Sequence, residues 1–107
     1  MTATHNIQDE IASEIKNNPI ILYMKGTKSM PMCGFSARVV EALNACNVDY
    51  ETRNVLDRDE LRQGIKDFSD WPTIPQLYIN EEFIGGCDIV LELFANGELQ
   101  KLIAADE

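Results

Sequence analysis

The fold is decided by the stretch Ile20-Ile21-Leu22-Tyr23-Met24, a short apolar run rich in β-branched and aromatic residues. An unbroken run of this kind is typical of a strand that is covered on both faces of its sheet. The segment from Phe35 to Cys46 repeats apolar residues at helical spacing and predicts a helix. Asp49 to Val55 then alternates weakly and predicts a second strand. A strand, a helix and a strand in this order predict a parallel pair of strands with a right-handed crossover.

The flanking segments add helices and a β-hairpin. Pro72 and Pro75 interrupt the chain before the hairpin, since each proline removes a backbone donor. The sequence therefore predicts one α/β domain over residues 1–107, with an ordered core from about 7 to 103 and a mixed sheet. The other predicted elements are a helix from Ile7 to Asn17, a helix with Leu61, Ile65 and Phe68 on one face, strands at Gln76–Asn80 and Glu82–Ile84, and a helical region with Ile89, Val90, Leu93 and Phe94 that continues through Leu99, Leu102 and Ile103.

The composition is that of a small globular domain and excludes several classes of protein. The 107 residues are 45% hydrophobic and 25% charged, which is ordinary for a folded domain. The formal net charge of -9 argues against nucleic acid, because phosphate neutralisation needs clustered Lys and Arg. The three cysteines are too few, and odd in number, for a secreted disulfide scaffold. No signal peptide or apolar segment of ~20 residues is apparent, so we expect no membrane span and a cytoplasmic location, with an organelle after processing as the alternative.

The charges are distributed unevenly along the chain. The window from Ile15 to Val40 contains no acidic residue and four basic ones, so it carries a charge of +4. The rest of the chain has five basic residues against 18 acidic ones, a charge of -13. Isolated surface lysines often have no function, but this basic window also contains Cys33. The four basic residues are Lys16, Lys25, Lys28 and Arg38.

Cys33 is the main candidate for chemistry. It lies between the end of the first predicted strand and the start of a helix, where the helix dipole and unpaired backbone N–H groups stabilise a thiolate. With Lys25, Lys28 or Arg38 nearby, we expect the pKa of this thiol to be depressed. The alternative is a buried, inert cysteine, which is common for a free thiol. Pro31 and Gly34 flank Cys33, however, and indicate a loop.

The positions of the other cysteines and of the histidine limit the reactions that Cys33 can take part in. Ser36 stands where a dithiol motif would place its second cysteine, and Cys46 would lie ~20 Å away along the helix, beyond disulfide reach. We therefore assign Cys46 to the core and expect any disulfide exchange at Cys33 to use a thiol from outside the chain. His5, the only histidine, falls in the N-terminal segment, and we expect it to be an exposed bystander. A Cys–His hydrolase and a self-contained zinc site are thus excluded.

Two further segments allow either a structural or a binding role. Thr73-Ile74-Pro75 could be a simple turn, or it could hold a cis peptide bond and present backbone amides to an extended peptide. Gly85-Gly86-Cys87-Asp88 could merely end the hairpin, or it could expose backbone N–H groups at a helix start, where they can bind a carboxylate. Cys87 is a second candidate for an exposed thiol, although we expect its backbone to contribute first.

Together these blocks resemble the CGFS-type monothiol glutaredoxins, in their short, single-domain form. The resemblance runs from about Ile7 to Ile103. It implies a thioredoxin fold with a four-stranded mixed sheet flanked by helices. The matching blocks, in order, are Lys25-Gly26, Pro31-Met32-Cys33-Gly34-Phe35-Ser36, Trp71-Pro72-Thr73-Ile74-Pro75-Gln76, Gly85-Gly86-Cys87-Asp88-Ile89 and Asn96-Gly97-Glu98-Leu99.

The resemblance also implies a glutathione site beside Cys33. Lys25 and Arg62 match the residues that hold the glycine carboxylate of glutathione. The backbone of Ile74 matches the group that pairs with the cysteinyl part, and Cys87 and Asp88 match the pair that takes the γ-glutamyl end.

The family further implies a [2Fe–2S] carrier, acting in cluster assembly, transfer or iron homeostasis. Such a cluster takes four thiolates, so Cys33 from each of two chains and two glutathiones would complete it. We therefore expect a cluster-bridged homodimer, a monomeric apo form, and iron–sulfur recipient proteins or a BolA-like protein as partners. A glutathione-dependent oxidoreductase acting through Cys33 is the alternative, and a plain interaction domain with an idle cysteine is a third hypothesis.

Overall fold

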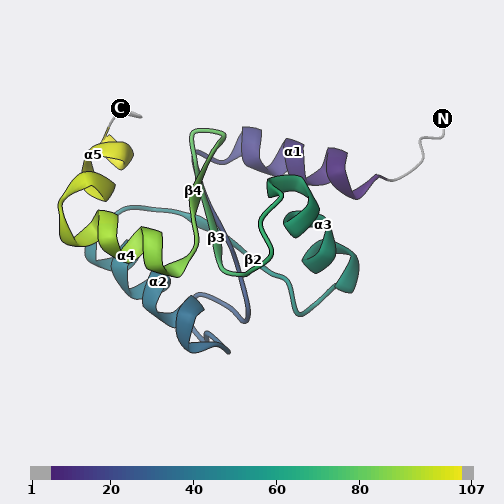
Figure 1. Cartoon of the computed structure of the whole chain (residues 1–107), viewed down its shortest axis with the longest axis horizontal. Helices are drawn as coiled ribbons and strands as arrows, with labels where there is room; N and C mark the ends of the chain where they lie inside the picture. Colours follow the sequence, from purple (N-terminus) through teal and green to yellow (C-terminus); the bar gives the residue numbers. More distant parts are fainter. Residues whose placement is uncertain (1–5, 105–107) are drawn as a thin grey trace.

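A computed structural model describes residues 6–104 of the chain. This part of the molecule contains five helices and four strands, which alternate as far as β3 and end with β4 and two consecutive helices (Figure 1). The elements are α1 (Ile7–Asn17), β1 (Ile20–Met24), α2 (Gly34–Ala45), β2 (Glu51–Asn54), α3 (Asp59–Ser69), β3 (Gln76–Ile79), β4 (Glu82–Gly85), α4 (Cys87–Ala95) and α5 (Glu98–Ala104).

The four strands form one mixed sheet in the order β2-β1-β3-β4. β1 pairs in parallel with β2, where Ile21 lies opposite Glu51, and antiparallel with β3, where Tyr23 lies opposite Gln76. β3 and β4 form the predicted hairpin. The predicted parallel pair and four-stranded mixed sheet are therefore confirmed, and the arrangement is that of a thioredoxin fold.

β1 is buried along its whole length because both faces of the sheet are covered. Ile20, Leu22 and Met24 face a core made with α2, α4 and α5, whereas Ile21 and Tyr23 face a second core made with α1 and α3. This division follows from the strand period of two, which sends alternate side chains to opposite faces. Figure 1 shows α2, α4 and α5 on one side of the sheet and α1 and α3 on the other.

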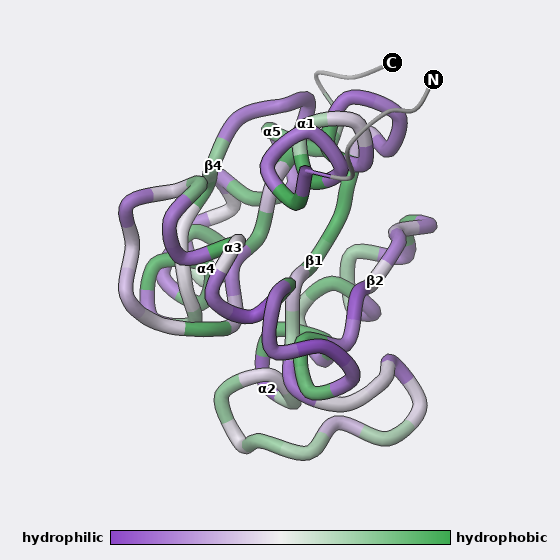
Figure 2. The backbone as a smooth tube through the Cα atoms, turned by 90° about the vertical axis from the view of Figure 1, so that its right-hand side faces the viewer, coloured by the Kyte–Doolittle hydropathy of each residue, from purple (hydrophilic) through white to green (hydrophobic). Residues whose placement is uncertain are grey.

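The edge strand β2 is shorter than the sequence predicted. Its residues are mostly hydrophilic, in contrast to the apolar β1 beside it (Figure 2). The strand was expected from Asp49 to Val55, but its ladder extends only from Glu51 to Asn54. At its carboxyl end the ladder stops because β1 ends at Met24, the partner of Asn54. The helix expected from Phe35 to Cys46 starts one residue earlier and ends one residue earlier, at Gly34 and Ala45.

α1 docks on α3 at Gly64, where the lack of a side chain allows close approach. A Cβ atom at Gly64 would lie 2.9 Å from the Cγ1 atom of Ile7. Gln8 also donates a hydrogen bond of 2.9 Å from its Nε2 atom to the Gly64 carbonyl. The contact fixes the position of α3, whose end leads into the loop before β3.

None of the described helices combines the length and the apolar composition that crossing a bilayer requires. The assignment of residues 1–107 to one domain stays a prediction, since residues 1–5 and 105–107, including His5, lie outside the described residues.

Candidate functional site

Cys33 is the N-cap residue of α2, at the edge of the sheet where β1 ends. A small hairpin connects β1 to the helix, closed by a bridge between Gly26 and Pro31 and by a hydrogen bond of 2.9 Å from the Met32 amide to the Lys25 carbonyl. Cys33 follows with extended backbone angles and is half-buried. The helix start therefore presents its first N–H groups to the Cys33 thiol, as the sequence predicted.

The surroundings lower the pKa of the Cys33 thiol below its ordinary value. The backbone N–H of Ser36 contributes most, and the backbone N–H of Phe35, the charge of Lys25 and the Ser36 hydroxyl act in the same direction. Partial burial opposes them but does not reverse the shift. The expected activation of Cys33 is therefore confirmed in its direction.

Only one of the three candidate cations acts on Cys33. Lys28 instead donates a hydrogen bond of 2.7 Å from Nζ to the Tyr50 carbonyl, and its ammonium lies 4.0 Å from the centre of the Tyr50 ring. The charge of Arg38 instead acts on Cys87, where it opposes but does not reverse the rise in pKa caused by burial. Of the three candidates, Lys25 is therefore the cation that helps to lower the pKa of Cys33, whereas Lys28 and Arg38 have other neighbours.

Ser36 holds the Cys33 loop against the end of β1. Its side chain is fully buried, and its hydroxyl oxygen accepts a hydrogen bond of 3.1 Å from the Lys25 amide. The Oγ–H remains available for the thiolate, since a hydroxyl both donates and accepts. A serine in the place of a second cysteine thus stabilises Cys33 without being able to form a disulfide with it.

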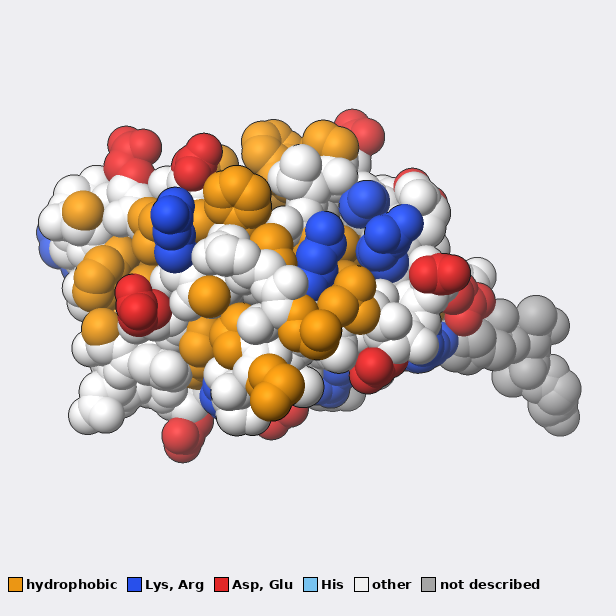
Figure 3. Space-filling view, turned by 90° about the horizontal axis from the view of Figure 1, so that it is seen from below, with side chains coloured by type: hydrophobic (Ala, Val, Ile, Leu, Met, Phe, Trp, Pro, Cys, Tyr) orange, Lys and Arg blue, Asp and Glu red, His pale blue; other side chains and the backbone are white. Residues whose placement is uncertain are grey.

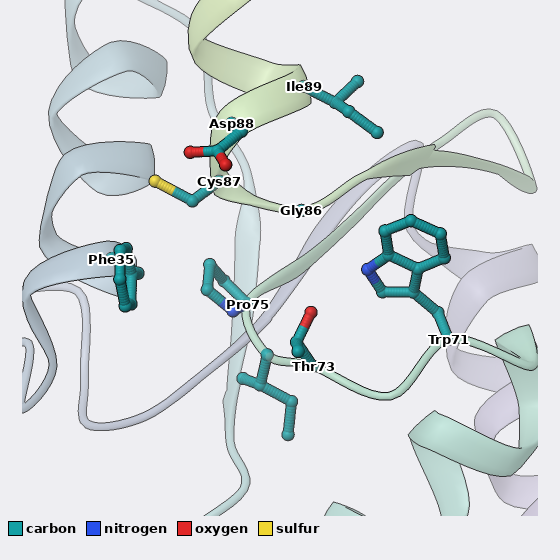
Figure 4. Close-up of a pocket in the computed structure, with 9 residues that line it drawn as sticks. Phe35, Trp71, Thr73, Pro75, Gly86, Cys87, Asp88 and Ile89 are labelled. Atoms are coloured by element: carbon teal, nitrogen blue, oxygen red, sulfur yellow. The ribbon is translucent and has the colours of Figure 1, made fainter.

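A pocket of about 220 Å³ opens next to Phe35, the second residue of α2. Figure 4 shows Phe35 and Trp71 at opposite sides of this pocket, with Pro75 between them. The peptide bond between Ile74 and Pro75 is cis, the predicted alternative for this segment. The pocket is lined by Phe35, Trp71, Thr73, Ile74, Pro75, Gly86, Cys87, Asp88 and Ile89.

The structure brings three of the five predicted glutathione residues into the pocket wall. Ile74, Cys87 and Asp88 line it, although they come from two segments that are separated in sequence. Lys25 is close enough to Cys33 for its charge to stabilise the thiolate. Arg62 is exposed on α3 and does not belong to the pocket wall.

Cys46 and Cys87 differ from Cys33 in both exposure and acidity. Cys87 was a candidate for an exposed thiol, but its side chain is buried, and burial together with the charge of Asp88 raises its pKa. Cys46, which was assigned to the core, is half-buried at the end of α2 and packs against the core, and burial raises its pKa as well. Cys33 is therefore the only one of the three cysteines whose pKa is lowered.

Sequence reasoning assigned no role to Phe35, Trp71 or Gln76. Phe35 and Trp71 are 55% and 38% exposed, and their position inside the motif blocks was the available signal. Gln76 is fully buried with its amide hydrogen-bonded, which no local pattern indicates. Across the described residues, no group of three or more His, Cys, Asp or Glu side chains is arranged to hold a metal ion.

Comparison with known proteins places this site in a family. The family model described as glutaredoxin matches residues 20–84, which include Cys33, Ile74 and the first three β-strands that position them. The chain belongs to the glutaredoxin family. More narrowly, its relatives among curated proteins are named monothiol glutaredoxins, in agreement with the single reactive cysteine.

Two of these monothiol glutaredoxins and one solved structure show how far the similarity extends. The chain is 59% identical over 86 residues to an uncharacterized monothiol glutaredoxin of Porphyra purpurea, covering 80% of each protein. It is 53% identical to the protein named probable monothiol glutaredoxin 2 of Rickettsia felis, covering 96% of this chain and 98% of the relative. The solution structure of reduced poplar apo GrxS14 superposes with a TM-score of 0.81 at 44% identity, covering 92% and 91% of the two chains. These glutaredoxins share both the fold and most of the length of this chain.

Proposed function

We propose that this monothiol glutaredoxin carries a [2Fe–2S] cluster, with Cys33 as its protein ligand and glutathione as co-ligand. The observation that carries the proposal is a single activated thiol next to an open pocket, with a serine in place of a second cysteine. Cys33 combines partial exposure with a lowered pKa, which favours the thiolate that binds iron. We expect the protein to act in the cytoplasm, in cluster assembly, transfer or iron homeostasis.

The donor set of the chain fits a shared cluster. A [2Fe–2S] cluster takes four thiolates, and the low-pKa thiol of Cys33 supplies one. Cys87 is buried at the start of α4 and its pKa is raised, and Cys46 lies at the far end of α2, so neither thiol favours the thiolate form as Cys33 does. Two chains and two glutathiones would supply the four sulfur ligands.

The pocket residues suit the three parts of glutathione. Ile74 would pair through its backbone with the cysteinyl part, and Lys25 and Arg62 would attract the glycine carboxylate. Asp88 and the backbone of Cys87, at the start of α4, would take the γ-glutamyl end with its ammonium and carboxylate groups. This assignment is supported by the joint position of Ile74, Cys87 and Asp88 in one pocket wall.

The surface around the pocket supports a protein partner. Met30, Met32, Phe35 and Ile89 are exposed apolar side chains, which monomeric proteins usually cover or use for binding. On the face seen from below, Figure 3 shows hydrophobic side chains in a central region with basic side chains beside them. We propose a second copy of the chain as the partner in the cluster-bound form, with the apo form monomeric. A BolA-like protein could replace one copy, and iron–sulfur recipient proteins would dock on the same face.

A glutathione-dependent oxidoreductase is the second candidate, favoured by the same low-pKa thiol. The Cys33 thiolate would attack the glutathionyl sulfur of a mixed disulfide and release the substrate as a thiolate. The Cys33–glutathione disulfide would then be attacked by a second glutathione thiolate, which regenerates the Cys33 thiolate and yields oxidised glutathione. This reaction needs no second cysteine in the chain.

Reconstitution of the apo protein with iron, sulfide and glutathione tests the cluster proposal. The expected result is a visible absorption band that coincides with a dimer in size-exclusion chromatography. Cys33→Ser should abolish the band, whereas the matched control Cys46→Ser should retain it. A colourless monomer would contradict the proposal, and rapid turnover of a small glutathionylated substrate by that monomer would favour the oxidoreductase.

A further inference from the structure

The loop from Asp70 to Pro75, which forms one wall of the pocket, is fastened at its start by the end of α3. The Trp71 amide donates hydrogen bonds of 3.1 Å to the Lys66 carbonyl and 3.1 Å to the Ser69 hydroxyl. Ser69 in turn donates to the Ile65 carbonyl at 3.1 Å, so its hydroxyl is held by the helix. The position of Trp71 is therefore tied to α3.

The same loop is fastened from its other end by the side chain of Gln76. Gln76 is the first residue of β3, and its side chain is fully buried. Its Nε2 atom donates to the Trp71 carbonyl at 3.2 Å and to the Thr73 carbonyl at 3.1 Å. Both amide hydrogens are thus used, and both bonds reach back to the loop that precedes the strand.

Tyr78 fixes which way the Gln76 amide faces. The Tyr78 hydroxyl donates a hydrogen bond of 3.0 Å to Oε1 of Gln76, so the NH₂ group is turned toward the loop. Burial raises the pKa of Tyr78 to about 12, and the hydroxyl stays protonated at neutral pH. Gln76 therefore makes three hydrogen bonds inside the protein, which compensates for burying a polar amide.

These bonds leave one backbone unit of the loop free for a ligand. Among the described residues, the backbone N–H and C=O of Ile74 have no hydrogen-bond partner in the chain. Ile74 lies between Thr73, which Gln76 holds, and Pro75, which leads directly into β3. Its peptide group is thus held at the pocket wall from both sides while its own polar atoms remain unused.

We propose that Gln76 is a positioning residue for the tripeptide site, because it holds the Trp71–Pro75 loop so that the Ile74 backbone can pair with an extended peptide. The inference rests on the proposed binding of glutathione at this pocket. It extends that proposal to a side chain that does not line the pocket and acts only through the loop. The class of ligand concerned is a peptide with a free backbone edge.

Glutathione titration of the apo protein, monitored by isothermal calorimetry, tests this inference with Gln76→Met. Methionine keeps the length and burial of the side chain but cannot donate to the two carbonyls. We expect about a tenfold loss of glutathione affinity. This loss corresponds roughly to the net contribution of one hydrogen bond. The pKa of Cys33, followed by thiolate absorbance, should not change, since Gln76 makes no contact with it.

Trp71 provides a second readout, because it is the only tryptophan in the chain. In Gln76→Met the loop should loosen, so acrylamide should quench Trp71 fluorescence more strongly than in the wild type. Ile103→Ala is the matched control, since Ile103 lies beside Ile20 and Val48 at the opposite end of β1 from Cys33. This control should lose thermal stability without any change in glutathione affinity or in Trp71 quenching.

The outcomes separate the inference from the proposed function. Wild-type affinity in Gln76→Met would overturn the positioning role, and so would an equal loss of affinity in Ile103→Ala. If the wild type itself fails to bind glutathione, that result contradicts both the proposed function and the positioning role of Gln76. Gln76→Asn, which keeps the amide but is one methylene shorter, replaces the methionine variant if that protein does not fold, with the same expected losses.

Discussion

At the scale of single residues, the chemistry depends on how Ser36 and Cys33 share one turn of α2. Ser36 is fully buried, yet its hydroxyl and its amide both act on a thiol that is only partly buried. Its oxygen accepts from the Lys25 amide, which fixes the hydroxyl in place. Ser36 therefore has two effects. It stands where a second cysteine would form a disulfide with Cys33, and it stabilises the Cys33 thiolate.

The pH dependence of alkylation should separate Cys33 from the other two cysteines. The pKa of Cys33 is lowered, so its thiolate persists as the pH falls through the range in which Cys46 and Cys87, with raised pKa values, are protonated. At neutral pH, iodoacetamide should therefore add once, at Cys33. In Ser36→Ala the midpoint of the alkylation rate should move to slightly higher pH, because the hydrogen bond of the hydroxyl to the thiolate is lost while that of the Ser36 backbone N–H remains.

Mass spectrometry of peptides after timed alkylation measures these midpoints. Ser29→Ala, which changes an exposed serine in the preceding hairpin, is the control and should leave the Cys33 midpoint unchanged. Equal rates at Cys33 and Cys46 across the pH range would show that Cys33 is not activated.

The sequence predicted the position of Cys33 better than the contacts of the residues around it. The position of Cys33 at a helix start could be predicted because a strand, a glycine-bearing loop and an apolar helix pattern are local signals. The engagement of Lys28 with Tyr50 could not, since the partners are 22 residues apart and meet only after the hairpin folds back. The burial of Cys87 depends on the packing of α4 against the core, which helical periodicity alone does not give.

At the scale of elements, the hairpin between β1 and α2 sets the position of Cys33, and Gly26 makes that hairpin possible. Gly26 has φ of 96°, a left-handed conformation that side chains disfavour. A Cβ atom there would lie 2.5 Å from the Met32 amide nitrogen and 2.6 Å from the Met30 carbonyl oxygen. Both neighbours are backbone atoms, so the clash cannot be relieved by turning a side chain.

Gly26→Ala should therefore lower the free energy of unfolding by about 2 to 4 kcal/mol, from backbone strain and overpacking together. Urea unfolding followed by circular dichroism measures the change. Gly34→Ala is the matched control, since a Cβ atom at Gly34 meets nothing within 4 Å and the residue starts a helix. It should change the free energy of unfolding by less than about 1 kcal/mol. Equal midpoints for the two variants would contradict this account of the hairpin.

Most elements were predictable because their sequence patterns agree with their surroundings. β1 is a continuous apolar run because helices cover both faces of the sheet at that strand. The ends of elements were less predictable. α2 and α4 begin at Gly34 and Cys87, where neither N-cap residue makes the side-chain cap bond that marks a helix start in sequence. The Gln76 clamp was not predicted, since it depends on the path of the loop from Trp71 to Pro75.

At the scale of the whole molecule, the net charge of -9 is the sum of a basic region around Cys33 and an acidic remainder. The window from Ile15 to Val40 carries the positive charge, and it includes β1, the hairpin and the first half of α2, which together present Cys33. This arrangement suits an anionic tripeptide and a thiolate. The acidic remainder includes most of α1, α3, α4 and α5, on the outer layers of the fold.

The central claim is that one chain provides only one ligand of a shared cluster. Native mass spectrometry of the reconstituted wild-type protein tests it most directly, because the method counts every component of the coloured species. We expect a single complex of two chains, one [2Fe–2S] cluster and two glutathiones, which is lost when glutathione is removed. A cluster bound to one chain, or a dimer that keeps its cluster without glutathione, would show that the ligands are not shared in this way.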